Sequence, residues 1–478
     1  MTFNSIDFAI FLPIVLLLYW VVTNRNLRVQ NVLLLIASYV FYGWWDWRFL
    51  FLIVISSSVD YLVGRGLAKT DEKGKRKLLL LTSIFINIGL LGFFKYYNFF
   101  VENFIGAFKF FGHTLQLRGL HIILPIGISF YTFQTLSYSI DVYRRKIEPT
   151  NDIIAFFTFV SFFPQLVAGP IERAKNLLPQ FRSKRTFKCD TAVDGMRQIL
   201  WGLFKKIVIA DNCAVSVNTI FSNYSHYSGS TLLLGALFFA FQIYADFSGY
   251  SDIAVGTARL FDIKLMRNFA VPYFSRDIAE FWRRWHISLS TWFRDYVYIP
   301  LGGSRCSTLL KIRNVFVIFL VSGFWHGANW TFVVWGALNA LYILPLMLLN
   351  KNRRYTDTVA EEKILPNIKE GFGIVLTFFM TVIAWVFFRA ESVTQAVYYI
   401  CTIFSVSLFS APEVFSRDTF VLIILFVLSE WVQRNKRHVL QFNKGTLPVF
   451  IQWGIYYVII SLIIFFGGNE QQFIYFQF

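Results

Sequence analysis

Charged residues are scarce in this chain of 478 residues: they make up 15% of it, whereas a soluble domain carries about 25%. Hydrophobic residues contribute 56%, and aromatic residues alone contribute 19%. A soluble protein would expose much of this apolar surface and aggregate, but a lipid bilayer solvates it. The composition therefore predicts an integral membrane protein built from many apolar helices.

Several motifs that would identify other classes of protein are missing. The four cysteines are far apart and form no C-x-x-C pair, so neither a disulfide framework nor a zinc site is indicated. The absence of HExxH, G-x-S-x-G and Walker A patterns argues against a metalloprotease, a nucleophile-elbow hydrolase and an ATP-driven pump. No basic segment precedes the first apolar stretch, which we therefore expect to remain as a transmembrane helix and not to be a signal peptide.

The net charge of +17 comes from 45 Lys and Arg against 28 Asp and Glu. These cations gather in short loops between apolar stretches, which favours the positive-inside rule over nucleic-acid binding. The loop 65–77 is the first strongly basic one, so alternation of the spans places it in the cytoplasm and the N-terminus outside. The loops 171–190, 351–370 and 434–444 are also basic. The tail after Phe466 has no cation, so we expect it to lie outside.

A bilayer-spanning helix needs about 20 mainly apolar residues, and such stretches occur along the whole chain. The clear candidates are 6–23, 29–45, 48–64, 78–97, 231–247, 314–332, 333–349, 371–389, 419–433 and 448–466. Shorter or interrupted candidates are 121–140, 151–169, 196–213, 252–263 and 392–410. We expect an all-α membrane protein of about eleven transmembrane helices with additional re-entrant or interfacial helices, forming one domain over 1–478.

The middle of the chain, about 121–332, is unusually polar and broken for lipid-embedded sequence. Broken backbone at membrane depth survives only when it is buried in protein or lines a water-filled cavity. We favour the cavity over ordinary loops, because the polar residues lie inside apolar runs. The interrupting residues are Pro125, Pro164, Gly169, Pro170, Asp246, Gly249, Asp252, Gly256, Pro272 and Pro300.

Within this centre, the segment 277–300 repeats apolar residues at steps of three or four, which predicts one helix face. Its polar flanks include Arg283, Arg284 and Arg294, so we expect this helix at the cytoplasmic interface or against the protein. His286 borders the apolar stripe and can face the protein interior. A histidine that only makes a structural hydrogen bond is the alternative.

His326 lies at the middle of the expected span 314–332. An ionisable side chain there costs about 3 kcal/mol if charged, so a functional role is the default hypothesis. Burial lowers the pKa of an imidazole, so a neutral His326 could accept the proton of a hydroxyl as a general base. A histidine that merely bonds two helices is again the alternative. The small residues beside it would permit close approach by another helix or by a substrate. The neighbours of His326 are Gly323, Trp325, Gly327, Asn329 and Trp330.

His286 and His326 could bind a metal ion only together with Asp246 or Asp252, and no metal site is predicted. We expect the two carboxylates to fix helices through hydrogen bonds. The remaining histidines have no comparable context: His113, His121, His226 and His438.

Long ordered motifs at 123–144, 162–181, 244–263, 281–303 and 322–340 resemble the membrane-bound O-acyltransferase (MBOAT) family. The last two read FWRRWHISLSTWFRDYVYIPLGG and SGFWHGANWTFVVWGALNA. The match looks closest to the bacterial alginate O-acetylation (AlgI-like) branch, which the tail FIYFQF (473–478) also resembles.

The resemblance implies a helical bundle around a central funnel or tunnel, where a cytoplasmic acyl thioester meets a hydroxyl acceptor. It matches His326 to the central catalytic histidine and His286 to the second histidine of the family. His286 would orient the thioester or transfer a proton. The residues expected to wall the tunnel or bind substrate are Trp282, Trp285, Trp325, Asn329 and Trp330. The residues expected to meet the donor's phosphates, or alternatively lipid headgroups, are Arg283, Arg284 and Arg294.

The function expected from this resemblance is acetyl transfer for exopolysaccharide modification at the bacterial inner membrane. The donor would be acetyl-CoA or an acyl carrier protein, with no tightly bound cofactor, and an extracytoplasmic partner protein would complete the transfer. The alternatives are a D-alanyl transferase for teichoic acid, a transporter of acyl groups or polysaccharide, and a membrane scaffold. The paired histidines argue against the last two, because a passive conduit needs no general base.

Overall fold

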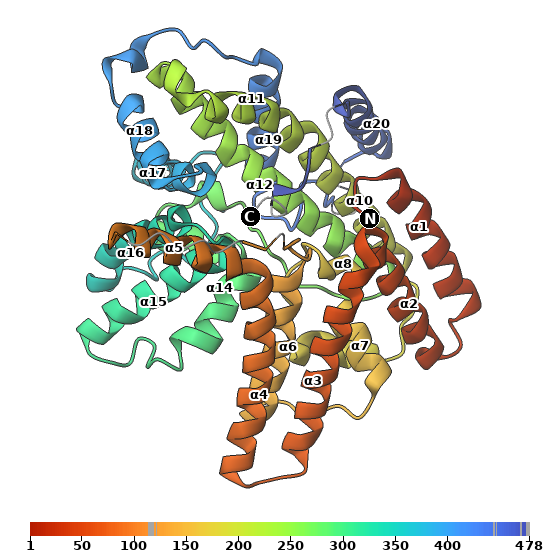
Figure 1. The fold of residues 1–478 in the computed structure, drawn as a ribbon. Coiled ribbons are helices and arrows are strands. Elements are labelled where there is room, and N and C mark those ends of the chain that lie inside the picture. The colour runs from red at the N-terminus through yellow and green to blue at the C-terminus, as the bar shows by residue number, and fades with distance from the viewer. Residues whose placement is uncertain (113–118, 121, 443–444, 446, 469–470, 475–478) are drawn as a thin grey trace. The chain divides into compact units, whose positions relative to one another are not determined.

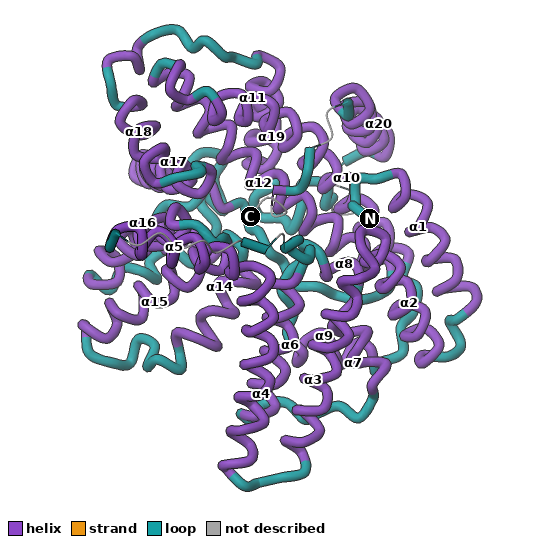
Figure 2. Tube along the Cα trace, in the orientation of Figure 1, coloured by secondary structure: helices purple, strands orange, loops and turns teal. Residues whose placement is uncertain are grey.

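The computed structural model describes residues 1–112, 119–120, 122–442, 445, 447–468 and 471–474. Over these residues the chain forms helices and loops and no strand, as Figure 2 shows. The expected all-α class is therefore confirmed. The described chain divides into two compact units, of which the first joins 1–192 to 257–265 and the second joins 193–256 to 266–478. A single functional domain over the whole chain stays a prediction.

The first unit is built from apolar helices of very different lengths. Its helices are α1 (Ile6–Leu17), η1 (Leu18–Val22), α2 (Leu27–Asp46), η2 (Trp47–Phe49), α3 (Leu50–Ala68), α4 (Lys73–Leu91), η3 (Gly92–Tyr96), α5 (Tyr97–Phe110), α6 (Ile128–Tyr143), α7 (Ile153–Ser161), α8 (Phe163–Leu166), α9 (Ala174–Leu177) and η4 (Leu178–Phe181). In the same unit α3, α4 and α6 pack against one another (Figure 1).

A buried carboxylate joins these three helices. Asp60 of α3 accepts hydrogen bonds from Ser83 (2.5 Å) and Asn87 (2.7 Å) of α4 and from Ser139 of α6. All four side chains are almost fully buried. Because a buried polar group is costly unless it is hydrogen-bonded, this cluster fixes how the three helices meet.

The second unit carries both histidines of interest. Its helices are α10 (Cys189–Leu203, whose first turn belongs to the first unit), η5 (Phe204–Ala210), α11 (Asp211–Ser222), η6 (Tyr224–His226), α12 (Gly229–Leu260, whose last turn belongs to the first unit), η7 (Pro272–Phe274), α13 (Ile278–Arg284), α14 (Ile287–Phe293), η8 (Arg294–Tyr298), α15 (Thr308–His326), α16 (Trp330–Leu348), α17 (Ile368–Arg389), α18 (Val393–Ile403), η9 (Val406–Phe409), α19 (Arg417–Val432) and α20 (Val449–Phe466). Contacts link α15 to α16, α16 to α17, and α13 to α16.

Seven helices in the described part of the chain are long and apolar enough to cross a bilayer. They are Leu27–Ala68, Lys73–Phe110, Gly229–Leu260, Thr308–His326, Trp330–Leu348, Ile368–Arg389 and Val449–Phe466. Two shorter apolar helices, Ile6–Val22 and Val393–Ile403, add to them. Many of these helices expose large apolar side chains, as lipid contact requires; α20, for example, buries only Ile459. About eleven spans therefore stays a prediction.

Two expected segments have a different structure. The candidate 252–263 is not a separate span, because α12 runs without interruption from Gly229 to Leu260. The expected continuous helix over 277–300 is wrong, since it is broken between α13 and α14. The apolar spacing continues across the break, which is why periodicity alone missed it.

Candidate functional site

Helices α15 and α16 lie side by side as a hairpin (Figure 1), and His326 belongs to α15. A Cβ atom on Gly323 would collide with the carbonyl oxygen of Phe332, and one on Gly336 with that of Phe319. Only glycine lets the two backbones approach so closely. The expectation that small residues near His326 permit close approach is confirmed, and the approaching element is α16.

His326 is the last residue of α15, so its expected place at mid-span is wrong. The next residue, Gly327, is extended. Helix α16 then starts after Asn329, whose side-chain oxygen accepts a hydrogen bond from the main-chain N–H of Thr331 at 3.0 Å. Because the break between the two apolar helices is short, hydropathy placed the end of the first span at residue 332, beyond the true end of α15. Gly327 and the N-cap residue Asn329 are local signals of the break.

The imidazole of His326 lies among aromatic rings and is 4% exposed. Its ring centroid is 4.9 Å from Trp325, 5.2 Å from Trp335 and 5.2 Å from Phe388. Trp385 stacks on Trp335 at 5.7 Å. These rings come from α15, α16 and α17, and they surround the histidine with apolar surface that keeps bulk water away.

His286 lies in the break between α13 and α14 and has a left-handed backbone with φ of +43°. The neighbouring segment satisfies the main-chain groups that the break releases. Ala270 donates its N–H to the carbonyl of Arg284 (3.0 Å), and Ile287 donates its N–H to the carbonyl of Asn268 (2.9 Å). Because its main-chain groups are hydrogen-bonded, the break is a stable part of the fold. It gives the His286 side chain a direction that a continuous helix would not give it.

The side chain of His286 is also buried, at 1% exposure. Its ring meets Phe247 of α12 edge-on at 4.6 Å and lies 6.2 Å from Trp325. Its Nδ1 is 3.1 Å from the side-chain oxygen of Asn268. Burial lowers the pKa of His286 to about 3, so this imidazole is neutral at physiological pH.

Trp325 brings the two histidines together, because its indole contacts both rings. The site therefore contains two buried imidazoles in an aromatic enclosure. Imidazole is the side chain best suited to moving a proton near neutral pH. Such a site suits a reaction in which a hydroxyl loses a proton and water must be excluded.

The sequence profile of the membrane-bound O-acyltransferase family matches residues 46–388, which include both histidines. The chain belongs to this family. It is accordingly a multi-pass membrane O-acyltransferase.

Relatives within the family refine the comparison. The chain is 42% identical to the probable alginate O-acetylase AlgI of Pseudomonas aeruginosa over 399 residues, which cover 83% of this chain and 73% of that protein. It is 33% identical to the peptidoglycan O-acetyltransferase of Helicobacter pylori over 522 residues, covering 98% of this chain and 95% of the relative. The teichoic acid D-alanyltransferase of Streptococcus thermophilus is 29% identical over 55% of this chain and 68% of its own length.

Besides Trp325, two expected tunnel residues reach the aromatic enclosure of this O-acyltransferase. Trp282 lies 5.6 Å from Trp335 and donates its indole N–H to the side-chain oxygen of Asn339 at 3.2 Å. Trp285 lies 5.0 Å from Trp385. Both therefore adjoin the pair of tryptophans beside His326.

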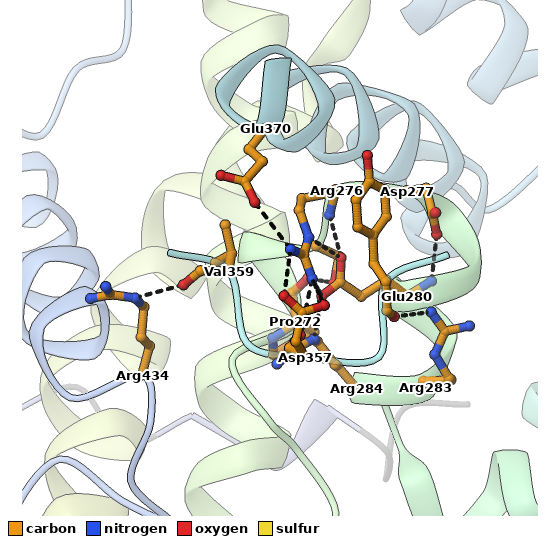
Figure 3. A network of polar contacts seen from close by, with 12 residues as sticks. Pro272, Arg276, Asp277, Glu280, Arg283, Arg284, Asp357, Val359, Glu370 and Arg434 are labelled. Atoms are coloured by element: carbon orange, nitrogen blue, oxygen red, sulfur yellow. Dashed lines mark hydrogen bonds and ion pairs between the residues drawn. The ribbon is translucent and has the colours of Figure 1, made fainter. Parts of the chain in front are cut away.

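Arg283 and Arg284 hold a loop, as Figure 3 shows in part. Arg283 donates to the main-chain carbonyls of Asn352 (2.7 Å) and Tyr355 (2.5 Å). Arg284 donates to the carbonyl of Asp357 at 2.7 Å. These bonds give both arginines a structural task, and their expected contact with donor phosphates or lipid headgroups stays a prediction.

Three other expected site residues lie at capping or exposed positions. Arg294 is 58% exposed and pairs with Asp295 at 2.7 Å. Asn329 caps α16 and donates to the carbonyl of Glu391 at 2.9 Å. Trp330, the first residue of α16, is 56% exposed. Their roles toward substrate stay predictions.

The carboxylates Asp246 and Asp252 each contact a lysine of η5. Lys206 lies 3.0 Å from Asp246 and 2.8 Å from Asp211. Lys205 lies 2.5 Å from Asp252. These buried ion pairs connect α12 to η5 and α11, a geometry suited to fixing helices.

The sequence did not single out Asn268, Lys205 or Lys206. Asn268 lies in an irregular segment without periodicity, so only the structure reveals its contact with His286. The sequence did contain a signal for the two lysines: adjacent cations inside an apolar stretch need buried acidic partners, which predicts ion pairs there.

Some earlier expectations fall at the edges of the described chain. Ile474 donates its N–H to Asp246 at 2.7 Å. The rest of the tail motif, 475–478, lies outside the described residues, as do His113 and His121. Over the described residues, no three His, Cys, Asp or Glu side chains are grouped as metal ligands would be.

Proposed function

We propose that this O-acyltransferase moves an acetyl group from a cytoplasmic thioester to a hydroxyl of an extracytoplasmic polysaccharide, with His326 as general base. The hydroxyl oxygen attacks the thioester carbonyl while His326 takes its proton. The carbon–sulfur bond then breaks, and the leaving thiolate takes up the proton that His326 accepted, which gives the free thiol. His286 orients the thioester or takes part in that proton transfer.

One observation carries this proposal: His326 and His286 are both buried and both contact Trp325. A general base needs a neutral imidazole, and an acyl thioester needs protection from water. The surrounding rings of Trp335, Trp385 and Phe388 supply an apolar wall for both purposes.

The acceptor is proposed from the named relatives. One is named for alginate and another, which matches nearly the whole chain, for peptidoglycan. Both acceptors are polysaccharides, so a sugar hydroxyl is the shared chemistry. We further propose the bacterial cytoplasmic membrane as the location and a central funnel or tunnel as the route. About eleven spans with both termini outside complete this topology.

The donor and partners follow from the same mechanism. Acetyl-CoA or an acetylated acyl carrier protein supplies the thioester, and no tightly bound cofactor is needed. A separate extracytoplasmic protein completes the delivery to the polymer. D-alanyl transfer is the second candidate, since a teichoic acid D-alanyltransferase matches 55% of the chain.

The test uses the full-length protein in detergent with radiolabelled acetyl thioester and short alginate or peptidoglycan oligosaccharides, which supply the hydroxyl acceptor without the partner that delivers the polymer. Wild-type protein should form acetyl ester, and His326→Ala should abolish it while unfolding at a similar temperature. Normal transfer by His326→Ala would overturn its role as base. A matched control is His226→Ala, because His226 is exposed in η6, and this variant should keep full activity.

Two further arms separate the alternatives. Transfer of D-alanyl but never of acetyl would overturn the proposed acyl group. Cleavage of the thioester in detergent, where no membrane has to be crossed, supports an enzyme over a passive transporter.

A further inference from the structure

Asn268 is the centre of a small buried hydrogen-bond network beside His286. It lies in the irregular segment between α12 and η7 and is 2% exposed. Its side-chain oxygen lies 3.1 Å from Nδ1 of His286 and 2.9 Å from Oγ of Ser288. Its side-chain nitrogen lies 3.1 Å from Oγ of Ser251 on α12.

The orientation of the Asn268 amide is set by a main-chain group. The N–H of Ser288 points to the Asn268 side chain at 3.3 Å, and a main-chain N–H can only donate. The atom that faces Ser288 and His286 must therefore be the oxygen Oδ1. The amide nitrogen then faces Ser251, whose hydroxyl can accept.

This orientation determines the tautomer of His286. Since Oδ1 of Asn268 is an acceptor, Nδ1 of His286 must donate to it and must carry the proton. Nε2 is then the nitrogen with the lone pair. The opposite tautomer would place the Nδ1 lone pair 3.1 Å from the Oδ1 of Asn268, where the two acceptors would repel each other.

We propose that Asn268 is a positioning residue that holds His286 as the Nδ1–H tautomer, so that Nε2 accepts a proton or hydrogen bond during acyl transfer. This inference rests on the proposed function of His286. Fixing a ring by a hydrogen bond to its second nitrogen is a general means of setting which nitrogen reacts.

The backbone around Asn268 makes this contact rigid. The Asn268 carbonyl accepts the N–H of Ile287, and its side-chain oxygen accepts the N–H of Ser288, so one residue holds the two main-chain N–H groups that follow the histidine. The described rings that face His286 are neutral: Phe247, Phe269 and Trp325. The amide of Asn268 and the hydroxyl of Ser288 also lie beside Nδ1, and both are neutral, so these neighbours favour a neutral imidazole.

Kinetics of two variants test the positioning role. Asn268→Ala removes the acceptor, and we expect kcat to fall by about 10- to 100-fold with little change in KM. Asn268→Asp keeps an acceptor for Nδ1–H and should restore part of kcat. Its carboxylate favours the imidazolium form of His286, so the acidic limb of the kcat profile should move to higher pH.

Asn314→Ala is a matched control. Asn314 is fully buried and donates to the carbonyls of Leu301 (3.1 Å) and Gly303 (3.3 Å). Its loss should lower the melting temperature, while kcat per folded molecule and the pH profile stay unchanged. A kinetic defect in Asn314→Ala equal to that of Asn268→Ala would overturn the positioning role, as would an unshifted pH profile in Asn268→Asp.

A measurement on the wild-type protein avoids any variant that fails to fold. Nitrogen-15 spectra of histidine-labelled full-length protein should show a protonated Nδ1 and an unprotonated Nε2 for His286 at neutral pH. The signals are assigned by their loss in His286→Gln. A proton on Nε2 would overturn the inference. This result does not depend on turnover, so absence of acetyl transfer would defeat the proposed function without defeating the tautomer.

Discussion

The indole of Trp325 contacts both His286 and His326. The centroid of the Trp325 ring lies 6.2 Å from that of His286 and 4.9 Å from that of His326. Trp325 is itself 4% exposed. Because the site is closely packed, a shift of this indole would move both imidazoles relative to the reacting groups.

We therefore expect Trp325→Phe to impair catalysis more than stability. The smaller ring leaves space in which either imidazole can shift, and a displacement of about 1 Å can cost up to about 100-fold in rate. Acetyl transfer should fall at least about 10-fold, with the melting temperature changed by only a few degrees. Steady-state kinetics and thermal unfolding in detergent measure the two effects.

Trp453→Phe is the matched control for this variant. Trp453 lies on α20 and is 55% exposed, far more than Trp325. It should retain wild-type kcat. Full activity in Trp325→Phe would show that the indole does not align the two histidines.

The close approach of α15 and α16 makes a second prediction. In Gly323→Ala the new methyl group meets the carbonyl of Phe332, and in Gly336→Ala it meets that of Phe319. Forcing the helices apart should cost about 1–3 kcal/mol of unfolding free energy. It should also lower acetyl transfer, because His326 is one turn beyond Gly323 on the same helix.

Gly454→Ala provides the comparison. Gly454 lies inside α20, beyond its first turn, and a Cβ atom there meets nothing within 4 Å. This change should be neutral or should stabilise the helix by up to about 1 kcal/mol. Equal destabilisation in all three variants would mean that helix propensity, and not close packing, dominates.

The sequence was most informative where a local pattern determines the structure. Long apolar runs predict the helical class, and isolated histidines among apolar residues draw attention to His286 and His326. The position of His326 at a helix end was missed, because hydropathy averages over a window wider than the break at Gly327. Gly327 and the capping residue Asn329 were the local signals that the helix ends at His326.

Contacts between distant residues were beyond local patterns. Asn268 is 18 residues from His286 in the chain, and nothing in its own segment marks it. Likewise, Lys206 pairs with Asp246 only because η5 and α12 are packed together. Such partners are fixed by tertiary structure, which no periodicity records.

Arg276 supports a third prediction. Figure 3 shows its guanidinium between the carboxylates of Glu280, Asp357 and Glu370, each 3.1 Å away. It also lies over the ring of Tyr355 at 4.2 Å. The same hydrogen bonds hold the pKa of Asp357 below its usual range. Arg276→Ala would leave the buried carboxylate of Glu280 partly unpaired. We expect this variant to destabilise the protein by about 3–5 kcal/mol.

Limited proteolysis shows which part of the protein becomes less stable in Arg276→Ala. With Arg276 removed, the loop that contains Arg353 and Arg354 should be released, and trypsin should cleave there faster than in the wild type. Arg276→Lys should be intermediate, because an ammonium cannot pair with several carboxylates as a planar guanidinium does. Arg417→Ala, at an exposed position, serves as the control and should leave the rate of cleavage at Arg353 and Arg354 unchanged.

The burial of His286 predicts a pH dependence of stability. Its pKa is about 3 in the folded protein, below the usual 6.5, because burial disfavours the charged form. Below pH 6.5 the unfolded chain binds a proton that the folded protein does not bind until about pH 3. The unfolding free energy should therefore decrease as pH falls, by about 2 kcal/mol between pH 7.5 and pH 5.

His286→Gln isolates this contribution, because every other titrating group is retained. The difference in unfolding free energy between wild type and variant should be constant above pH 7 and should shrink or reverse toward pH 5. Parallel curves for the two proteins at all pH values would mean that His286 binds its proton equally well in both states. That outcome would contradict a neutral, buried imidazole at this position and, with it, the acceptor role assigned to Nε2.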